Sequence, residues 1–156
     1  MILSAQTIRR LCQSDAPLLT PFVERGVFNG VSFGLSSCGY DIRIREDLHI
    51  SRGKFALASS VERFDLPTNI CMRVLDKSTW ARQGLFCQNT IAEPGWRGYL
   101  TLELTLHKDT SFPNRVIYSG TAIAQVIFEQ LDYPTEIPYV GKYQNQPPRA
   151  VEAKFE

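Results

Sequence analysis

The sequence predicts an all-β domain, a compact β-sandwich or jelly roll with one short helix at its N-terminus. Beyond Pro21 the chain is a series of short alternating runs separated by Gly, Pro, Asn and Asp, which is typical of antiparallel sheets. The clearest run, residues 99–107, places a leucine at every second position. No internal repeat appears, and 156 residues suffice for one domain with a sizeable core. We therefore expect a single domain over residues 1–156.

The segment with helical spacing lies near the N-terminus. Ile8, Leu11 and Cys12 fall on one face of a helix. The side chain of Ser4 is suited to cap this helix by accepting from the backbone N–H groups that follow it. Two prolines between residues 15 and 21 end the pattern. We expect a short helix here and strands afterwards.

The predicted strands follow in order along the chain. Tyr40, Ile42 and Ile44 alternate with polar residues, so one face of this strand is expected to be buried. Further strand candidates are residues 55–59, 70–75, 85–88, 99–107, 115–118 and 121–131. The C-terminal residues 141–156 are predicted to form a flexible tail.

Composition and charge argue against several classes of protein. The formal net charge is +1 and the basic residues are scattered, which argues against a nucleic-acid surface. No apolar run approaches the roughly 20 residues of a membrane span, and the N-terminus shows no secretory signal. The four cysteines are widely spaced and no CxxC motif occurs. We expect reduced thiols in a cytoplasmic protein, and no zinc site.

Glu103 is the first candidate functional residue. On the strand of residues 99–107 the leucines face one side, so Glu103 lies on the other side between Thr101 and Thr105. An ordinary exposed face would carry mixed charges, whereas this face carries a lone carboxylate at mid-strand. From the strand pattern alone, two interpretations of Glu103 stay open: a functional carboxylate, or a surface residue that is solvated or paired with an arginine.

Gln125 lies in the run AIAQVIF, which is apolar on both faces. A buried amide must find partners for its donors and its acceptor. Two interpretations stay open: a hydrogen bond in the core or at a subunit interface, or a polar contact at the mouth of a site.

The stretch Lys77-Ser78-Thr79-Trp80-Ala81-Arg82 follows an apolar strand. Ser78 or Thr79 can cap a single helical turn that runs through Arg82. Free N–H groups at a helix start bind anions, and neighbouring hydroxyls and cations strengthen this binding. These residues alone are compatible with a phosphate site and with a capped turn that exposes its charges.

Together these segments resemble the dCTP deaminase family of the trimeric dUTPase-like superfamily. The resemblance rests on KSTWARQGL, AEPGWRGYLTLEL, AIAQVIF and GKYQNQ, with FGLSSCGYDIRI and KFALASSVERFDLP upstream. It implies a distorted jelly-roll homotrimer with active sites at subunit interfaces. It also implies zinc-independent hydrolysis of dCTP to dUTP and ammonia, with Mg²⁺ bound through the triphosphate. The family's feedback inhibitor dTTP becomes a candidate effector.

The matching motifs imply a role for each candidate residue. Glu103 is expected to be the general base, while Ser78 and Arg82 orient the water and stabilise charge developing at C4 of the base. The other substrate-binding candidates are Lys77, Thr79, Trp80, Ala81, Asn89, Thr90, Glu93, Thr101, Leu102, Gln125, Tyr139, Lys142 and Gln146. The last three belong to a tail, about residues 139–156, that is expected to close over the active site.

The chain departs from the family pattern at three places. Asn89 stands where a small or aliphatic residue is usual. Only four residues separate Ile50 from Phe55, where family members often carry a longer loop. The segment around Tyr139 is compressed. The short loop bears on whether dTTP regulates the protein.

The competing activity on the same fold is dUTP hydrolysis. Glu93 and Trp96 stand where dUTP pyrophosphatases carry an aspartate and a sugar-stacking tyrosine. Alternatives to dCTP deamination are therefore a bifunctional enzyme that also splits dUTP to dUMP, a dUTPase, and a non-catalytic nucleotide-binding trimer.

Overall fold

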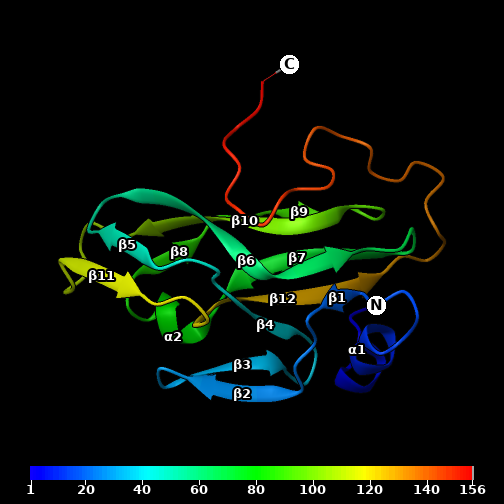
Figure 1. Cartoon of the computed structure of the whole chain (residues 1–156), viewed down its shortest axis with the longest axis horizontal. Helices are drawn as coiled ribbons and strands as arrows, with labels where there is room; N and C mark the ends of the chain where they lie inside the picture. Colours follow the sequence, from blue (N-terminus) through cyan, green and yellow to red (C-terminus); the bar gives the residue numbers. More distant parts are fainter. Residues whose placement is uncertain (156) are drawn as a thin grey trace.

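The structure, a computed structural model, describes residues 1–155. Antiparallel strands dominate it, so the predicted all-β class with a short N-terminal helix is confirmed (Figure 1). The elements are α1 (Ala5–Cys12), β1 (Leu19–Thr20), β2 (Arg25–Phe28), β3 (Val31–Leu35), β4 (Tyr40–Arg43), β5 (Leu48–Ser51), β6 (Phe55–Asp65), β7 (Ile70–Asp76), α2 (Ser78–Ala81), β8 (Leu85–Cys87), β9 (Ile91–Ala92), β10 (Arg97–Leu106), β11 (Asn114–Ile117) and β12 (Ala122–Gln130).

Two larger sheets and one strand pair make up the domain. The first sheet has the order β2-β3-β4-β12-β7-β9, the second β1-β6-β10-β8, and β5 pairs with β11. The core lies between the two larger sheets, where the rings of Phe64 on β6 and Phe128 on β12 lie 6.5 Å apart. This is the sandwich arrangement that alternating strands favour.

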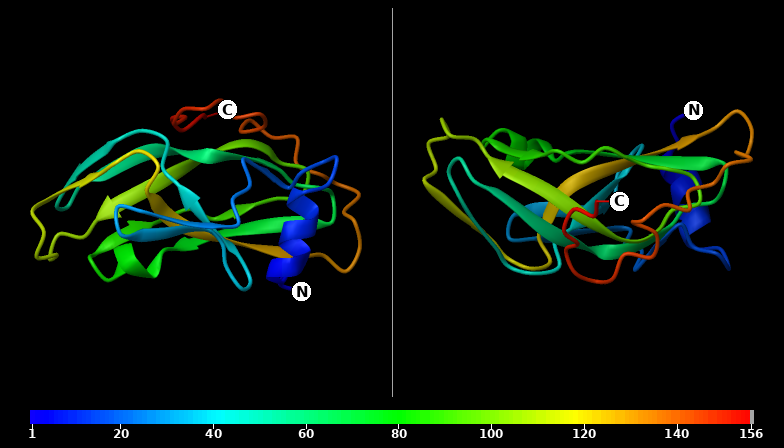
Figure 2. Two further views of the ribbon diagram at one scale, coloured as in Figure 1. Left: turned by 60° about the horizontal axis from the view of Figure 1, so that its bottom comes forward. Right: turned by 90° about the horizontal axis from the view of Figure 1, so that it is seen from above.

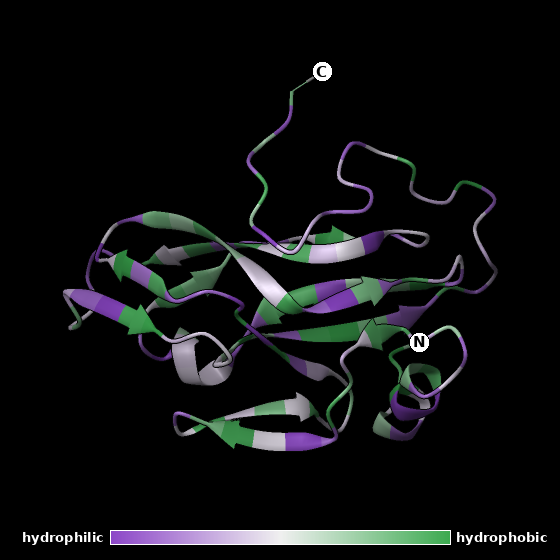
Figure 3. Ribbon diagram, in the orientation of Figure 1, coloured by the Kyte–Doolittle hydropathy of each residue, from purple (hydrophilic) through white to green (hydrophobic). Residues whose placement is uncertain are grey.

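The leucines of β10 confirm the alternation read from the sequence. Leu102, Leu104 and Leu106 are fully buried and Leu100 is 8% exposed. Burial of one leucine side chain contributes about 1.5–3 kcal/mol, so this row anchors the strand and fixes which of its residues face the other side. In Figure 3 the partner-sheet strand β12 is hydrophobic over most of its length.

Some elements lie where no strand was singled out. β6 extends to Asp65, six residues beyond the predicted end, and residues 25–28, 31–35 and 48–51 are also strands. β2 and β3 contain Gly26 and Gly34, and their pairing with each other rather than a strong alternation defines them. Strand pairing of this kind is set by tertiary context, which overrides weak local preference.

The N-terminal helix forms over residues 5–12 with Ser4 at its N-cap, but the expected side-chain cap is wrong. The backbone carbonyl of Ser4 accepts from the N–H groups of Thr7 and Ile8. Its hydroxyl lies 3.3 Å from the hydroxyl of Thr7. The helix is therefore held by the burial of Ile8 and Cys12 rather than by a hydroxyl cap.

The C-terminal segment returns to the sheets after leaving β12. It runs around one end of the molecule and crosses back over β10, where Gly98 and Gln146 form a parallel bridge (Figures 1 and 2). Glu156, the last residue of the predicted tail, lies outside the described residues. No helix within residues 1–155 is long and apolar enough to cross a membrane.

Candidate active site

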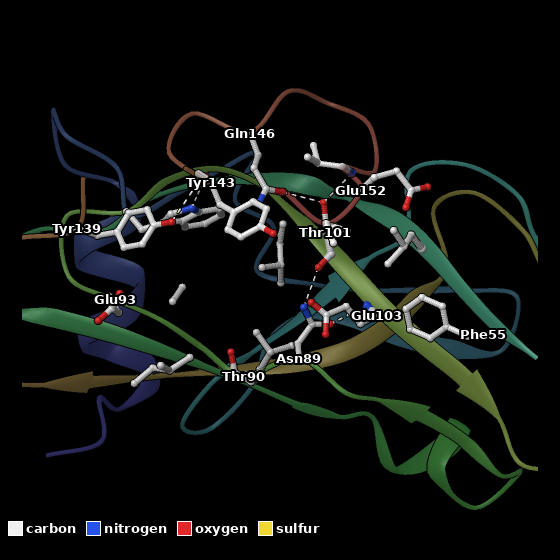
Figure 4. Close-up of a pocket in the computed structure, with 18 residues that line it drawn as sticks. Phe55, Asn89, Thr90, Glu93, Thr101, Glu103, Tyr139, Tyr143, Gln146 and Glu152 are labelled. Atoms are coloured by element: carbon white, nitrogen blue, oxygen red, sulfur yellow. Dashed lines mark hydrogen bonds between the residues drawn. The ribbon is translucent and has the colours of Figure 1, made fainter. Parts of the chain in front are cut away.

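A cavity of about 490 Å³ lies between β10, the β7–β9 edge and the C-terminal segment (Figure 4). Its lining is apolar for the most part, with carboxylate, amide and hydroxyl groups among the apolar side chains. The residues that line it are Phe55, Leu57, Val74, Asn89, Thr90, Ile91, Ala92, Glu93, Trp96, Leu100, Thr101, Glu103, Tyr139, Tyr143, Gln146, Val151, Glu152 and Ala153. An apolar cavity with a few polar groups is the form that small-molecule sites take.

The cavity opens because the chain changes sheets beside it. β8 pairs with β10 as far as Cys87, opposite Leu104. After three residues the chain joins the other sheet as β9, where Ile91 pairs with Arg73 of β7. The two sheets diverge at this crossover, and the polar face of β10 borders the space between them.

Glu103 projects from β10 into this cavity and is half-buried. Its backbone N–H donates to Asn89. Within residues 1–155 its carboxylate has no hydrogen-bond or ion-pair partner, so no arginine of the same described chain is paired with it. A carboxylate that accepts no bond from the protein is free to accept a proton from a bound water.

Thr101, two residues before Glu103, holds the C-terminal segment. Its hydroxyl donates to Oε1 of Gln146 at 2.7 Å and accepts from the N–H of Val151 at 3.1 Å. The predicted contact residues Thr101 and Gln146 therefore lie together in the cavity wall. Leu102, by contrast, is fully buried in the core. It does not line the cavity, although its neighbours Thr101 and Glu103 do.

Further hydrogen bonds tie this segment to the β9–β10 turn. The indole N–H of Trp96 donates to the carbonyl of Tyr143. The side chain of Gln144 accepts from the N–H of Arg97 and donates to the carbonyl of Gly95. The prediction of a flexible tail is therefore wrong for residues 143–146, because hydrogen bonds hold them to residues that lie about 45 positions earlier in the chain.

The KSTWAR stretch forms the predicted single turn, α2, but its cap is not a hydroxyl. Lys77 is the N-cap residue and no side chain caps the helix. The ammonium of Lys77 is buried and lies 2.6 Å from a carboxylate oxygen of Asp41. The Trp80 indole donates to the carbonyl of Ala122, which ties the turn to the sheet. A phosphate contact by Lys77, which stays a prediction, would require its pair with Asp41 to open.

Ser78, Thr79 and Arg82 are exposed on this turn. Arg82 and Ala81 line a second depression of about 350 Å³ with residues 83–84, 86, 107 and 109–112. Within residues 1–155 no residue lines both this depression and the Glu103 cavity. One chain therefore does not bring Ser78 and Arg82 into the cavity that contains Glu103.

Gln125 lies outside both cavities, between β4 and β7 in the sheet. Its amide N–H donates to Asp41 at 3.2 Å and to the Ser36 hydroxyl at 3.4 Å. Asp41 thus joins Gln125 to Lys77 in one polar cluster. This geometry favours the interpretation of Gln125 as a structural amide within the described chain.

Burial governs the electrostatics around the site. Burial raises the pKa of the Cys87 thiol to about 12, so this thiol, which donates to Asn89, is protonated at neutral pH. Burial also raises the pKa of Glu62, which is paired with Arg43 at 2.7 Å. Within residues 1–155, no three His, Cys, Asp or Glu side chains gather closely enough to hold a metal ion.

The predicted site residues thus fall into three groups. Asn89, Thr90, Glu93, Thr101, Glu103, Tyr139 and Gln146 line the Glu103 cavity. Lys77, Ser78, Thr79, Trp80, Ala81 and Arg82 lie on or beside α2, outside this cavity. Gln125, Leu102 and Lys142 lie elsewhere. In the view of Figure 4, Glu93 and Glu103 lie on opposite sides of Thr90, and Phe55 lies beyond Glu103.

Tyr143 and Glu152 line the cavity without having been singled out. A signal for Tyr143 was available, since an aromatic residue stood between the two tail candidates Lys142 and Gln146. Nothing local distinguishes Glu152, because only the path of the tail brings it to the cavity.

The comparisons with known proteins agree with this fold. The native dUTPase of EIAV superposes with a TM-score of 0.57 at 20% identity, covering 80% of this chain and 98% of that one. A 2'-deoxycytidine 5'-triphosphate deaminase from Agrobacterium tumefaciens gives a TM-score of 0.64 at 17% identity, covering 83% of this chain and 47% of that one. At these identities the likeness shows the fold alone, which is the dUTPase-like fold.

Sequence similarity then narrows the class. A family model described as dCTP deaminase-like matches residues 40–131. A dCTP deaminase of Roseiflexus castenholzii is 38% identical over an alignment of 169 positions that covers 85% of this chain and 90% of that protein. The chain belongs to the dCTP deaminase-like family.

Proposed function

We propose that this protein is a dCTP deaminase, which hydrolyses dCTP to dUTP and ammonia. The observation that carries the proposal is the unpaired carboxylate of Glu103 in a cavity large enough for a nucleotide base and sugar. The family supplies the substrate class, since its relatives are described as dCTP deaminases.

In the proposed reaction Glu103 takes a proton from a bound water as the water oxygen attacks C4 of cytosine. The same carboxyl group passes this proton to ring N3 and then moves the remaining hydroxyl proton of the tetrahedral intermediate to the amino group, so that ammonia leaves as the C4 carbonyl of uracil forms. General acid–base catalysis of this kind contributes roughly 10²–10⁴-fold. The apolar cavity wall, which includes Leu57, Val74 and Leu100, strengthens the electrostatic interactions of the reacting groups.

Ser78 and Arg82 are proposed to complete the site from a neighbouring subunit. Both are exposed on α2 and outside the Glu103 cavity of their own chain, which is the placement that a site shared between chains requires. Arg82 is suited to stabilise charge that develops at C4, and the hydroxyl of Ser78 to orient the water. This supports a homotrimer in which each interface forms one active site.

Magnesium is proposed to enter with the nucleotide as part of the Mg·dCTP substrate. Mg²⁺ is usually held by substrate phosphates together with one or two carboxylates and water. Among the described residues no cluster of ligating side chains forms a dedicated metal cage. The phosphates would then lie near the exposed α2 turn. The hydroxyl of Thr79 and the ammonium of the tail residue Lys142 would contact them.

The position of Glu93 in the cavity supports dUTP hydrolysis as a second candidate activity. Its exposed carboxylate lines the same cavity as the carboxylates of Glu103 and Glu152, so a carboxylate other than Glu103 is available there to activate a second water. A bifunctional enzyme would split the dUTP that it makes into dUMP and pyrophosphate.

One assay separates these activities. The protein is incubated with Mg²⁺ and dCTP, then with Mg²⁺ and dUTP, while ammonia and pyrophosphate are followed separately. Ammonia without pyrophosphate supports the deaminase, and both products from dCTP support the bifunctional enzyme. Nucleotide binding without either product contradicts both enzymes and leaves a binding trimer. Adding dTTP to the same assay tests whether it is an effector.

A further inference from the structure

The side chain of Asn89 occupies a place where a β-strand would otherwise continue. Antiparallel pairing of β8 with β10 proceeds from Leu106↔Leu85 to Leu104↔Cys87, and the Gln88 N–H still donates to the Glu103 carbonyl at 2.8 Å. Continuing this register would pair Leu102 with Asn89 and Thr101 with Thr90. The strand instead departs for the other sheet.

Asn89 makes two of the hydrogen bonds that this departure removes from the ladder. Its Oδ1 accepts from the Glu103 N–H at 2.8 Å, and its Nδ2 donates to the Thr101 carbonyl at 2.7 Å. In a continued strand the carbonyl of Gln88 and the N–H of Thr90 would fill these positions. The carbonyl of Thr90 instead accepts from Val74 of β7.

These contacts fix the orientation of the amide group as well as its place. A flipped amide would set its NH₂ against the Glu103 N–H and its oxygen against the Thr101 carbonyl, and neither contact would be a hydrogen bond. The Cys87 thiol, 3.1 Å from Oδ1, is a further donor to the same oxygen. Asn89 thus holds the backbone on both sides of Leu102.

We propose that Asn89 is a positioning residue for Glu103, holding the strand beneath the catalytic carboxylate in place while the chain leaves to open the cavity. This inference rests on the proposed function, because it takes Glu103 as the general base. β6 pairs with the other edge of β10, where Glu103 lies opposite Leu57. Without Asn89 the N–H of Glu103 would face the open cavity, and the strand would be held from one side only.

The first test compares steady-state kinetics with Mg·dCTP. Because both polar atoms of the Asn89 side chain are bonded to the backbone of β10, the proposal places its effect on Glu103, and Asn89→Ala should lower kcat roughly 10- to 100-fold, the scale of a misplacement of about 1 Å. The KM for dCTP should change by less than about threefold. Gln88→Ala is the matched control, since it removes a neighbouring side chain that bonds the Thr105 hydroxyl and keeps the Gln88 backbone bond. It should retain the kcat of the unaltered protein.

The second test follows amide hydrogen exchange at Glu103 by NMR, which requires no turnover. Exchange of the Glu103 N–H should be at least about tenfold faster in Asn89→Ala than in the unaltered protein or in Gln88→Ala. If the unaltered protein releases no ammonia from dCTP, the proposed function fails, and exchange still decides whether Asn89 holds this strand.

Asn89→Asp provides a second variant if Asn89→Ala does not fold. It keeps the acceptor for the Glu103 N–H but sets a charged oxygen against the Thr101 carbonyl, so kcat should fall while the Glu103 N–H stays protected. An unchanged kcat in both variants, an increase confined to KM, or an equal loss in Gln88→Ala would overturn the proposal. So would a Glu103 amide that stays protected in Asn89→Ala.

Discussion

At the scale of single residues, burial decides which side chains are available for chemistry. Glu103 is half-buried with a carboxylate that bonds to no other described residue. Lys77 is buried and committed to Asp41. Both residues were candidate site residues from the sequence, where nothing distinguishes the carboxylate of Glu103 from the lysine next to hydroxyls as an available group. Only long-range neighbours, 36 residues away in the case of Lys77, distinguish the free group from the paired one.

The cysteines give a residue-scale prediction from their pKa values. Burial raises the pKa of Cys12 to about 11 and that of Cys87 to about 12, and it also raises the pKa of Cys71. These three thiols stay protonated at pH 8, whereas Cys38 is exposed. A thiol-reactive chromophore should therefore label one cysteine rapidly in the native protein and all four after denaturation.

The control for this labelling is Cys38→Ser, which should abolish the rapid phase without changing the total of slow thiols. Rapid labelling of two or more cysteines in the native protein would contradict the burial assigned to Cys12, Cys71 and Cys87.

The buried Glu62 gives a prediction for the pH dependence of stability. Burial raises the pKa of Glu62 above its ordinary value of 4.5. At a pH between the unfolded and the folded pKa, the Glu62 carboxyl is therefore more protonated in the folded protein than in the unfolded chain. The free energy of unfolding contributed by Glu62 therefore falls as the pH rises through this window.

Chemical denaturation at pH 5 and pH 8 measures this contribution. The fall in the free energy of unfolding between the two values should be larger in the unaltered protein than in Glu62→Gln, whose side chain does not titrate. Equal falls in both proteins would show that Glu62 does not titrate abnormally. The comparison uses the difference between pH values, because Gln also changes the bonds to Arg43.

At the scale of elements, β10 is the strand on which the site is built. Its leucine face is buried in the core, and its other face presents Thr101 and Glu103 to the cavity. The period-two pattern was sufficient to predict this strand and its two faces. The crossover from β8 to β9 was not predictable, because it depends on which sheet each residue joins rather than on local sequence.

The C-terminal segment is the second element that sequence described incompletely. Its residues were matched to the site, yet residues 141–156 were expected to form a flexible tail. Its bonds to Trp96, Arg97 and Thr101 come from a strand far away in the chain. A segment rich in Gln and Pro carries no local signal for such partners.

Thr101→Val is predicted to loosen this segment, since it removes the hydroxyl that bonds both Gln146 and Val151. Limited trypsin digestion should cleave faster at the exposed Lys142 and Arg149 in this variant. Thr105→Val, on the same face of β10 and away from the segment, is the control. Equal cleavage rates in the two variants would contradict the role of Thr101.

At the scale of the whole molecule, the separation of α2 from the Glu103 cavity leads to the proposed assembly. Glu103 and the pair Ser78 and Arg82 are not joined within one chain. A second chain that places its α2 at this cavity would complete the set. The resemblance of motifs predicted such shared sites, while a single chain alone could not reveal them.

Mixing two inactive variants tests whether the sites are shared. Glu103→Gln and Ser78→Ala are unfolded together and refolded at equal concentrations. With random assembly, about a quarter of the sites would combine an intact Glu103 from one chain with an intact Ser78 from another, so about a quarter of the activity should return. No recovery, with trimers present, would place each complete site within one chain.

The most direct test of the account is Glu103→Gln, measured by ammonia release from Mg·dCTP and by binding of the same nucleotide. Glutamine keeps the size and the backbone bond to Asn89 but cannot take the proton from water. We predict that kcat falls at least about 10²-fold, while the dissociation constant for dCTP and the assembly state remain those of the unaltered protein. Turnover close to that of the unaltered protein would contradict Glu103 as the general base.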